Sequence, residues 1–185
     1  KRPCLPIDGE PVCLDPQIAA DETAKLVTGN CFEGLVRLDE SGAIVPGAAQ
    51  RWDVSADGRT YTFHLREGMK WHIADSDELE RLLGKGKTID TTLNAEDFAF
   101  GLKRALLPET GMASAKALYA IENAQAVHRG TARSDQLGVR VVNASTLEIR
   151  LARADSAFLY ALTLPMSMPC DEAFFLATSG RYGLE

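Results

Sequence analysis

The chain has 185 residues, of which 45% are hydrophobic and 25% are charged, and this composition is that of a folded domain with a sizeable core. The net charge of −6 is spread along the chain without a basic cluster, which argues against nucleic-acid binding, because neutralising phosphates takes grouped Lys and Arg. No apolar run approaches the roughly 20 residues that span a bilayer. The chain opens on Lys1-Arg2-Pro3-Cys4 without an apolar signal core, so we expect any targeting segment to lie upstream.

The N-terminal part predicts one helix and two short strands. Apolar residues at helical spacing predict a helix from about residue 21 to 32, with Asp21 or Thr23 as its cap. Two short apolar runs, 35–38 and 43–45, then predict strands on either side of a turn.

The clearest strand follows the hairpin-type turn Asp57-Gly58. Tyr61, Phe63 and Leu65 alternate there with polar residues, and a period of two buries one face of a strand and solvates the other.

Residues 72–91 are predicted to be an inserted surface excursion. Leu79, Leu82 and Leu83 indicate one face of a short helix that Gly84 ends. The run 84–88 has some likeness to the end of a phosphate-binding loop, but it lacks the first glycine and the preceding apolar strand, so an ordinary loop is favoured.

The best helix start is Asn94. It is a good cap, Asp97 follows in the first turn, and Leu93 with Phe98 are placed as a hydrophobic staple. This helix is expected to stop before Pro108, and a second helix is expected over 113 to about 127.

The remaining elements are a hairpin, a short helix and an extended end. Residues 138–142 and 147–151 predict the two strands of a hairpin around 143–145, a short helix is expected near 156–162, and 164–169 is expected to be extended because of its prolines. Strands and helices follow one another without a regular βαβ repeat, which predicts an α+β fold with antiparallel hairpins.

We identify no catalytic residues, metal ligands or cofactor motif in the sequence. His64 lies on the polar face of a predicted strand, and Glu96-Asp97 is better explained by the start of a helix than by paired catalytic carboxylates. The Asn143-Ala144-Ser145 run fits a glycosylation acceptor, but a hairpin turn accounts for it as well.

Four cysteines, Cys4, Cys13, Cys31 and Cys170, allow three fully paired connectivities. Their spacing does not fit a paired CxxC zinc site. Free thiols and a disulfide both remain open, and a disulfide requires an oxidising compartment.

Several motifs occur in an order that resembles the oligopeptide- and dipeptide-binding proteins of ABC importers, solute-binding protein family 5. The likeness runs from about Leu14 to Pro169. The motifs that carry it are Leu14-Asp15-Pro16-Gln17, Cys31-Phe32-Glu33-Gly34-Leu35-Val36, Pro46-Gly47-Ala48-Ala49-Gln50-Arg51-Trp52, the stretch from Ser55 to Trp71, Asn94-Ala95-Glu96-Asp97-Phe98, and Leu137-Gly138-Val139 followed by Thr146-Leu147-Glu148-Ile149-Arg150-Leu151.

The resemblance implies a bilobed binding protein of which this chain is an N-terminal part. Residues 1–42 would be the first segment of the first lobe, 43–162 an inserted accessory α+β domain, and 163–185 the start of the return into the first lobe. The second lobe and the rest of the first lobe would be absent. The family usually has a short turn where this chain has residues 72–91.

The resemblance also implies the site and the partners. Ala20, Asp21 and Glu22 fall where family members offer main-chain groups to the ligand, and Cys31 with Cys170 would pair in an oxidising compartment because both fall in first-lobe segments. We expect a monomeric, non-enzymatic receptor without a cofactor, periplasmic or lipid-anchored, that passes a peptide or other small solute to a membrane permease.

Three alternatives stay open. The same scaffold could bind a nickel complex, a sugar or a signalling peptide. An enzyme would need its nucleophile and base from the absent half. A surface interaction module would use the excursion at 72–91.

Overall fold

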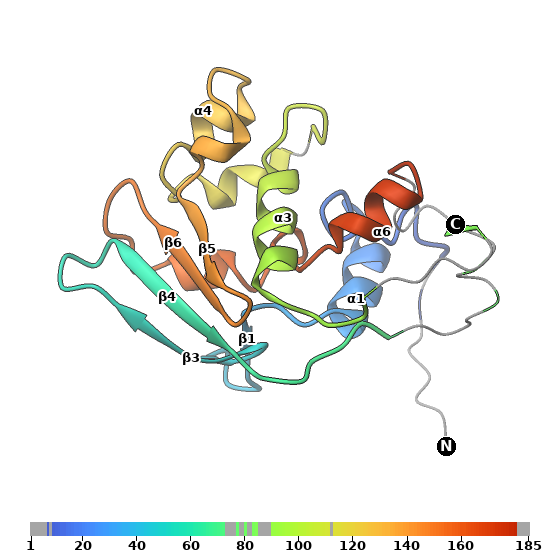
Figure 1. Cartoon of the computed structure of the whole chain (residues 1–185), viewed down its shortest axis with the longest axis horizontal. Helices are drawn as coiled ribbons and strands as arrows, with labels where there is room; N and C mark the ends of the chain where they lie inside the picture. Colours follow the sequence, from blue (N-terminus) through green and yellow to red (C-terminus); the bar gives the residue numbers. More distant parts are fainter. Residues whose placement is uncertain are drawn as a thin grey trace.

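A computed structural model describes residues 7, 9–72, 77, 80, 83, 84, 90–111 and 113–180. The helix α3 (Ala95–Ala105) runs through the middle of the molecule. An antiparallel sheet lies on one side of it, and the helices α1 (Glu22–Cys31) and α6 (Glu172–Ala177) lie on the other (Figure 1). The expected α+β architecture with hairpins is confirmed.

The larger sheet has four antiparallel strands in the order β3-β4-β6-β5. They are β3 (Ala49–Val54), β4 (Thr60–Leu65), β5 (Val139–Asn143) and β6 (Thr146–Arg150). Two hairpins thus meet along β4 and β6, where Phe63 lies opposite Leu147 and Tyr61 opposite Ile149. The predicted strand after Asp57-Gly58 and the predicted second hairpin are both confirmed.

The core forms because the buried face of this sheet packs against α3. Alternate residues of β4 and β6 point inward, as the period of two requires, and α3 contributes an apolar stripe at spacings of three and four. The largest fully buried side chains are Phe63, Phe98, Phe158, Leu35, Leu102, Leu106, Leu118, Ile121, Leu147, Ile149, Leu151 and Leu162.

The N-terminal elements form as the sequence predicts. Asp21 caps α1, since its Oδ1 accepts a hydrogen bond of 2.8 Å from the Ala24 amide. The strands β1 (Val36–Leu38) and β2 (Ile44–Pro46) pair antiparallel in a separate small sheet.

Asn94 begins α3 through a complete capping box. Its side chain accepts from the first-turn amides, and the Asp97 carboxylate accepts from the Asn94 amide at 2.8 Å. The predicted start and the stop before Pro108 are therefore confirmed, and Phe98 of the predicted staple is fully buried.

The helix expected over residues 113–127 is wrong. The chain instead forms the 3-10 helix η1 (Ala113–Leu118) and the short helix α4 (Ala124–His128). Between them Ile121 forms an isolated antiparallel bridge with Leu151, and Asn123 takes a left-handed φ of 63°. A continuous helix would lose this pairing with the sheet, so the tertiary contact overrides the local pattern.

The C-terminal part is more helical than expected. The short helix near residues 156–162 is confirmed as α5 (Phe158–Ala161). Residues 164–169 are not fully extended, because Pro165 begins the 3-10 helix η3 (Pro165–Ser167), where its fixed φ suits the first position. The helix α6 and the 3-10 helix η2 (Ser134–Gln136) were not predicted.

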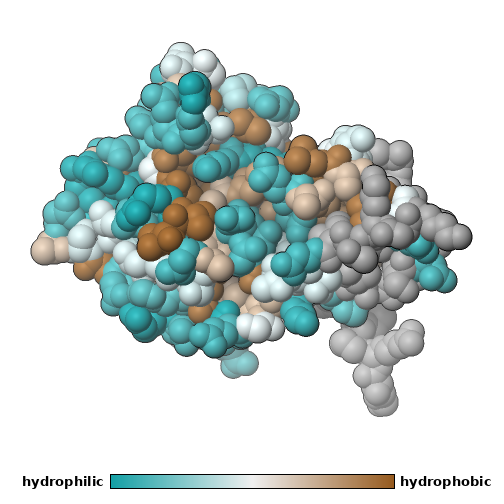
Figure 2. Space-filling model, in the orientation of Figure 1, coloured by the Kyte–Doolittle hydropathy of each residue, from teal (hydrophilic) through white to brown (hydrophobic). Residues whose placement is uncertain are grey.

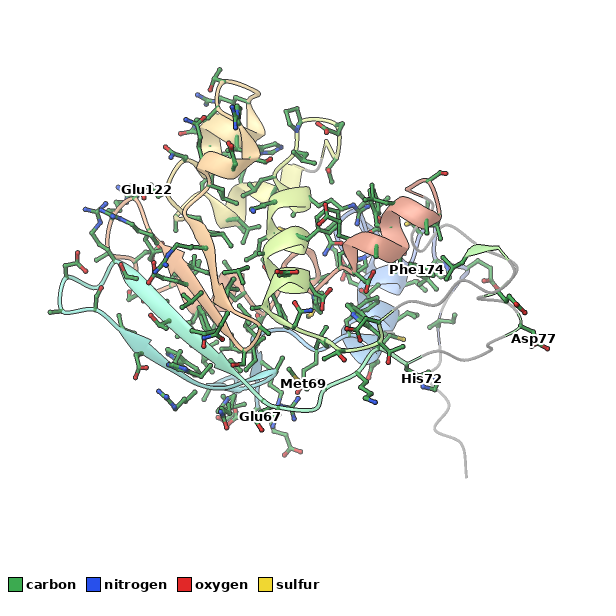
Figure 3. The ribbon with its side chains drawn as sticks, viewed as in Figure 1. Glu67, Met69, His72, Asp77, Glu122 and Phe174 are labelled. Carbon is green, nitrogen blue, oxygen red and sulfur yellow. The ribbon has the colours of Figure 1, made fainter. Side chains whose placement is uncertain are left out.

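The two ends of the 72–91 excursion are hydrogen-bonded to each other. The Trp71 amide donates to the Thr91 carbonyl at 2.7 Å, and the Leu93 amide donates to the Met69 carbonyl at 3.0 Å. Leu79 and Leu82 of the predicted short helix lie outside the described residues, and Leu83 is buried. His72 and Asp77 lie well away from the sheet, toward the side of the view that holds α1 and α6 (Figure 3).

The face of the molecule that Figure 2 shows is mostly polar. On the face in Figure 2, hydrophobic residues occur as separate patches among hydrophilic ones. Within the described part of the chain, no helix is both long enough and apolar enough to cross a membrane.

Candidate ligand-binding site

The resemblance predicts that main-chain groups of residues 20–22, at the start of α1, face the ligand. Ala20 and Glu22 are exposed there, and Asp21 is half-buried. The Asp21 side chain is engaged in capping, and the hydrogen bond from the Ala24 amide is the main reason that the pKa of Asp21 lies below its ordinary value. Glu22 forms an exposed ion pair of 2.7 Å with Lys25. Both side chains therefore make contacts within α1.

A tight, buried turn leads into this segment. The Asp15 carbonyl accepts from the amides of Ile18 at 3.1 Å and Ala19 at 2.8 Å, and Asp15 Oδ1 accepts from the Gln17 amide at 3.0 Å. Asp15 and Gln17 are each only 1% exposed. Charged and polar groups this deeply buried need partners, and α3 supplies one of them.

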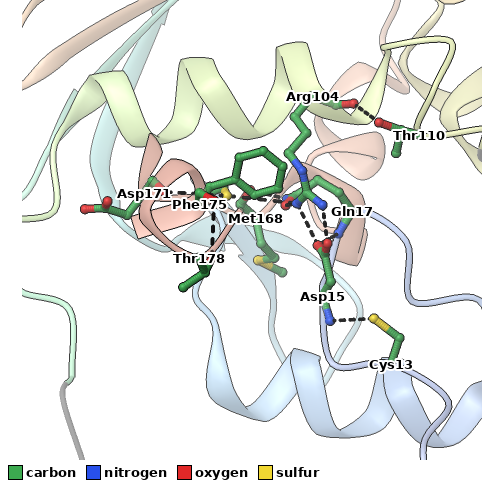
Figure 4. A network of polar contacts seen from close by, with 10 residues as sticks. Cys13, Asp15, Gln17, Arg104, Thr110, Met168, Asp171, Phe175 and Thr178 are labelled. Atoms are coloured by element: carbon green, nitrogen blue, oxygen red, sulfur yellow. Dashed lines mark hydrogen bonds and ion pairs between the residues drawn. The ribbon is translucent and has the colours of Figure 1, made fainter. Parts of the chain in front are cut away.

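Arg104 of α3 is that partner. Its Nη1 donates to Asp15 Oδ1 and to Gln17 Oε1, both at 2.8 Å, and its Nη2 pairs with Asp15 Oδ2 (Figure 4). Burial disfavours the charge on Arg104, but the hydrogen bond and charge of Asp15 outweigh it, so the pKa of Arg104 is raised. The result is a bidentate ion pair between residues 89 positions apart.

The segment after η3 completes the network. Gln17 Nε2 donates to the Met168 carbonyl at 2.9 Å, and the Phe175 ring centroid lies 4.4 Å from Arg104 Cζ, a cation–π distance. Arg104 Nη1 also lies 4.0 Å from Cys170 Sγ. One guanidinium thus joins residues 15–17, α3 and residues 168–175, as Figure 4 shows.

One face of α3 is devoted to this contact. Asp97, Gly101 and Arg104 are four and three residues apart, a spacing that aligns them on a helix. The Asp97 carbonyl accepts from the Cys170 amide at 3.0 Å, and a Cβ on Gly101 would lie 2.4 Å from the Met168 carbonyl oxygen. A glycine is needed here because the two backbones are in contact.

Asp97 is a second buried acid on this face. It is 6% exposed, and burial raises its pKa to about 6, against the opposing effect of the Asn94 amide; the charges of Asp171 and Glu96 raise it further. The Trp71 indole N–H is also buried and faces this carboxylate, which lowers the pKa somewhat. Asp97 therefore carries a charge at neutral pH at a cost to the fold.

The two cysteines of the expected disulfide lie in different environments. Cys31 is exposed at the end of α1, whereas Cys170 is fully buried beside Arg104, and both are free thiols in this structure. Burial raises the pKa of the Cys170 thiol to about 12, despite the lowering effect of Arg104. The pairing of Cys31 with Cys170 stays a prediction for the oxidised protein.

His64 of β4 is hydrogen-bonded to the neighbouring strand β3. His64 Nε2 lies 2.8 Å from Asp53 Oδ2 on the exposed face of the sheet, where Arg51 also pairs with Asp53, and this agrees with its expected place on the polar face of the strand. His, Cys, Asp and Glu side chains in the described ranges do not gather in threes that could hold a metal ion. The Asn143 side chain caps the hairpin turn by accepting from the Ser145 amide at 3.0 Å.

Sequence reasoning missed Arg104 and Gln17. Lys103-Arg104 has the appearance of a basic last turn that complements the helix dipole, and this ordinary explanation hides the buried role of the second residue. The signal that was available is the alignment of Asp97, Gly101 and Arg104 beside the apolar stripe of α3.

The chain is similar to known solute-binding proteins over most of its length. Residues 43–179 match the family described as bacterial extracellular solute-binding proteins, family 5 Middle. The chain is 41% identical over 147 residues, 78% of its length, to the periplasmic murein peptide-binding protein MppA of Escherichia coli K12, and covers 24% of that protein. It is 35% identical over 162 residues to the probable deoxycholate-binding periplasmic protein YgiS of the same organism, covering 86% of this chain and 27% of the relative.

The solved structures agree. The substrate-binding domain of an oligopeptide ABC transporter from Bacillus anthracis superposes with a TM-score of 0.81 at 33% identity, over 95% of this chain and 31% of that one. The chain therefore spans about a quarter to a third of the length of these relatives. The relatives are solute-binding proteins and not enzymes. This chain belongs to the bacterial extracellular solute-binding proteins of family 5.

Proposed function

We propose that this chain is part of the extracytoplasmic substrate-binding component of an ABC importer, which captures oligopeptides or dipeptides and delivers them to a membrane permease. The observation that carries the proposal is the match of nearly the whole fold to the substrate-binding domain of an oligopeptide ABC transporter. The similarity to a murein peptide-binding protein supports a peptide ligand in particular.

The main chain of Ala20, Asp21 and Glu22 takes part in holding the peptide. Main-chain donors and acceptors recognise the repeating amides of a peptide whatever its side chains are. The side chains of Asp21 and Glu22 make contacts within α1, as a cap and an ion pair, and this is consistent with recognition by the main chain.

The lobe boundaries follow from the same proposal. Residues 1–42 and 163–185 belong to the first lobe, and 43–162 form the accessory domain. Direct contact between the two flanking pieces, through Gln17 and the Met168 carbonyl, supports this division, as does the compact core of sheet and α3 between them.

Native mass spectrometry of the protein produced from its complete gene tests the ligand class. Denaturation after purification should release a ladder of short peptides if the proposal is right. A single non-peptide species, such as a bile acid, a nickel complex or a sugar, would keep the transport role and replace the substrate. If nothing co-purifies and a peptide library does not raise the melting temperature, the peptide assignment is wrong.

Location and assembly are tested separately. In size-exclusion chromatography, a monomer should elute at the mass of a single chain. A lipid-anchored protein should partition into a detergent phase, whereas a periplasmic protein without an anchor should not. Co-purification of permease subunits after cross-linking would support delivery to an importer, and a dimer that persists on dilution would contradict the monomer.

A further inference from the structure

Packing of the hydrophobic core does not by itself require an arginine at position 104. Its aliphatic neighbours on α3 already pack the helix against the sheet, and the guanidinium points the other way, toward the turn that precedes α1 (Figure 4). Taking a buried charge pair out of water is costly, and apolar side chains of similar size often stabilise a fold equally well. A buried pair is therefore weak evidence for a stabilising role, which leaves room for a role in positioning.

We propose that Arg104 is a positioning residue for ligand capture, which holds the turn at Asp15–Gln17 and thereby fixes the main chain of Ala20–Glu22 relative to the accessory domain. The inference rests on the proposed function, because it assumes that Ala20–Glu22 face the ligand.

The hydrogen bonds run from α3 through Asp15 to Ala19, the residue before the proposed ligand-facing segment. Arg104 holds both carboxylate oxygens of Asp15. The carbonyl of the same Asp15 accepts from the Ala19 amide at 2.8 Å, one residue before Ala20. A displacement of Asp15 is therefore passed to Ala20 through one buried turn.

The chemistry requires arginine. The planar guanidinium binds two carboxylate oxygens and the Gln17 amide oxygen at once, while its face lies on the Phe175 ring. Phe175 in turn contacts Phe100 of α3 with ring centroids 5.7 Å apart. A lysine would keep the charge but could not match this planar arrangement, so Arg104→Lys separates orientation from charge.

The experiment uses the protein produced from its complete gene. A defined library of tri- to pentapeptides is first screened by native mass spectrometry, and the tightest-binding member serves as the probe in calorimetric titrations. Arg104→Lys and Arg104→Met are compared with two controls. Arg140→Met removes an exposed arginine that is paired with Glu148, and Leu147→Ala weakens the core of the sheet without touching the network.

Both Arg104 variants should lose at least tenfold in affinity for the probe. Amide exchange in residues 18–24 should speed up by a similar factor, while exchange in β4 and β6 stays unchanged. Leu147→Ala should be less stable to unfolding, but under conditions where it is folded its affinity for the probe should lie within about twofold of wild type. Arg140→Met should match wild type in both stability and affinity.

The outcomes separate this inference from the proposed function. If wild type binds no library member, the peptide-receptor function fails and the positioning role fails with it. If wild type binds and the Arg104 variants bind equally well, only the positioning role is wrong. A loss of affinity in Leu147→Ala as large as in Arg104→Lys would also overturn it, since general loosening would then explain both.

An unfolded Arg104→Met variant would not block the test. Asp15→Asn combined with Arg104→Met leaves no unpaired buried charge and retains an acceptor for the Gln17 amide. This double variant should fold and still lose affinity, and wild-type affinity in it would contradict the inference.

Discussion

Gly101 and Met168 bring two backbones into contact. A Cβ added to Gly101 would lie 2.4 Å from the Met168 carbonyl oxygen, closer than real Cβ atoms come to heavy atoms outside their own residue and its chain neighbours. The contact places residues 168–170 directly on α3. On the same helix, the Asp97 carbonyl accepts a hydrogen bond from the Cys170 amide, and Arg104 donates one to the Gln17 side chain.

Gly101→Ala should destabilise the fold. The new methyl group must push the 168–170 segment off α3, and overpacking of this kind costs about 1–3 kcal/mol. Urea unfolding followed by circular dichroism measures the change.

Gly29→Ala is the matched control. Gly29 also lies inside a helix, α1, but a Cβ there would meet nothing within 4 Å. It should gain about 0.5–1 kcal/mol from higher helix propensity. Equal effects of the two substitutions would mean that the backbone contact at Gly101 is unimportant.

Asp97 should make stability depend on pH between about 4 and 6. Its carboxyl has an ordinary pKa of 3.8 and a pKa of about 6 in the folded protein, so over this range the unfolded chain loses its proton first. Each rising pH unit in the window therefore costs the fold about 1.4 kcal/mol, and the loss approaches 3 kcal/mol at neutral pH.

Asp97→Asn should remove this dependence, because an amide does not titrate in this range. The cap should survive, because the amide oxygen can still accept from the Asn94 amide. The unfolding free energy of the variant minus that of wild type should rise by about 2–3 kcal/mol from pH 4 to pH 7. Glu96→Gln, at the exposed neighbouring position, should leave the profile nearly unchanged. A difference that is flat with pH would mean that Asp97 does not titrate in this window.

The cysteines should differ in reactivity in the reduced protein. Cys31 is exposed, so it should react with a maleimide in the native state, whereas Cys170 is fully buried with a raised pKa and should react only on unfolding. Mass spectrometry of digested, labelled protein gives the two rates, with Cys31→Ser as the control for site assignment.

A thiol count tests the predicted disulfide. The chain has four cysteines, so four thiols titrated under denaturing, non-reducing conditions would rule out the Cys31–Cys170 pair. Two thiols, with a disulfide-linked peptide that joins these residues, would support it.

The excursion at 72–91 should be removable without loss of the fold. Lys70 pairs with Thr92, and the Trp71 amide donates to the Thr91 carbonyl, so the ends already stand at hairpin separation. Replacing residues 72–90 with Asn-Gly supplies a two-residue turn that suits antiparallel strands.

The shortened protein should bind the peptide probe with wild-type affinity. The loss of the buried Leu83 should lower its unfolding free energy by about 1.5–3 kcal/mol. If the excursion is an interaction module, the deletion should abolish partner binding and nothing else. A loss of peptide affinity would instead make the excursion part of the ligand site.

Interactions between residues that are close in the sequence predict much of this fold without knowledge of any long-range contact. The alternation of Tyr61, Phe63 and Leu65 determines a half-buried strand, and Asn94 with Asp97 determines where α3 begins, because both patterns act within a few residues. The ordered motifs also identify the family. The same reasoning could not see the break at Ile121, since its pairing with Leu151 is not local.

The fold class, the main strands and helices, and the protein family could thus be predicted from the amino-acid sequence alone. Only the tertiary structure showed that Arg104, Asp15 and Gln17 meet, that Asp97 is buried, and that Gly101 lies against Met168. Helical and strand periods report which face of an element is apolar, but they do not report which distant segment covers it. The burial of a residue, a raised pKa and a contact between two backbones all depend on which distant segment packs there. They can therefore be known only from the packed structure.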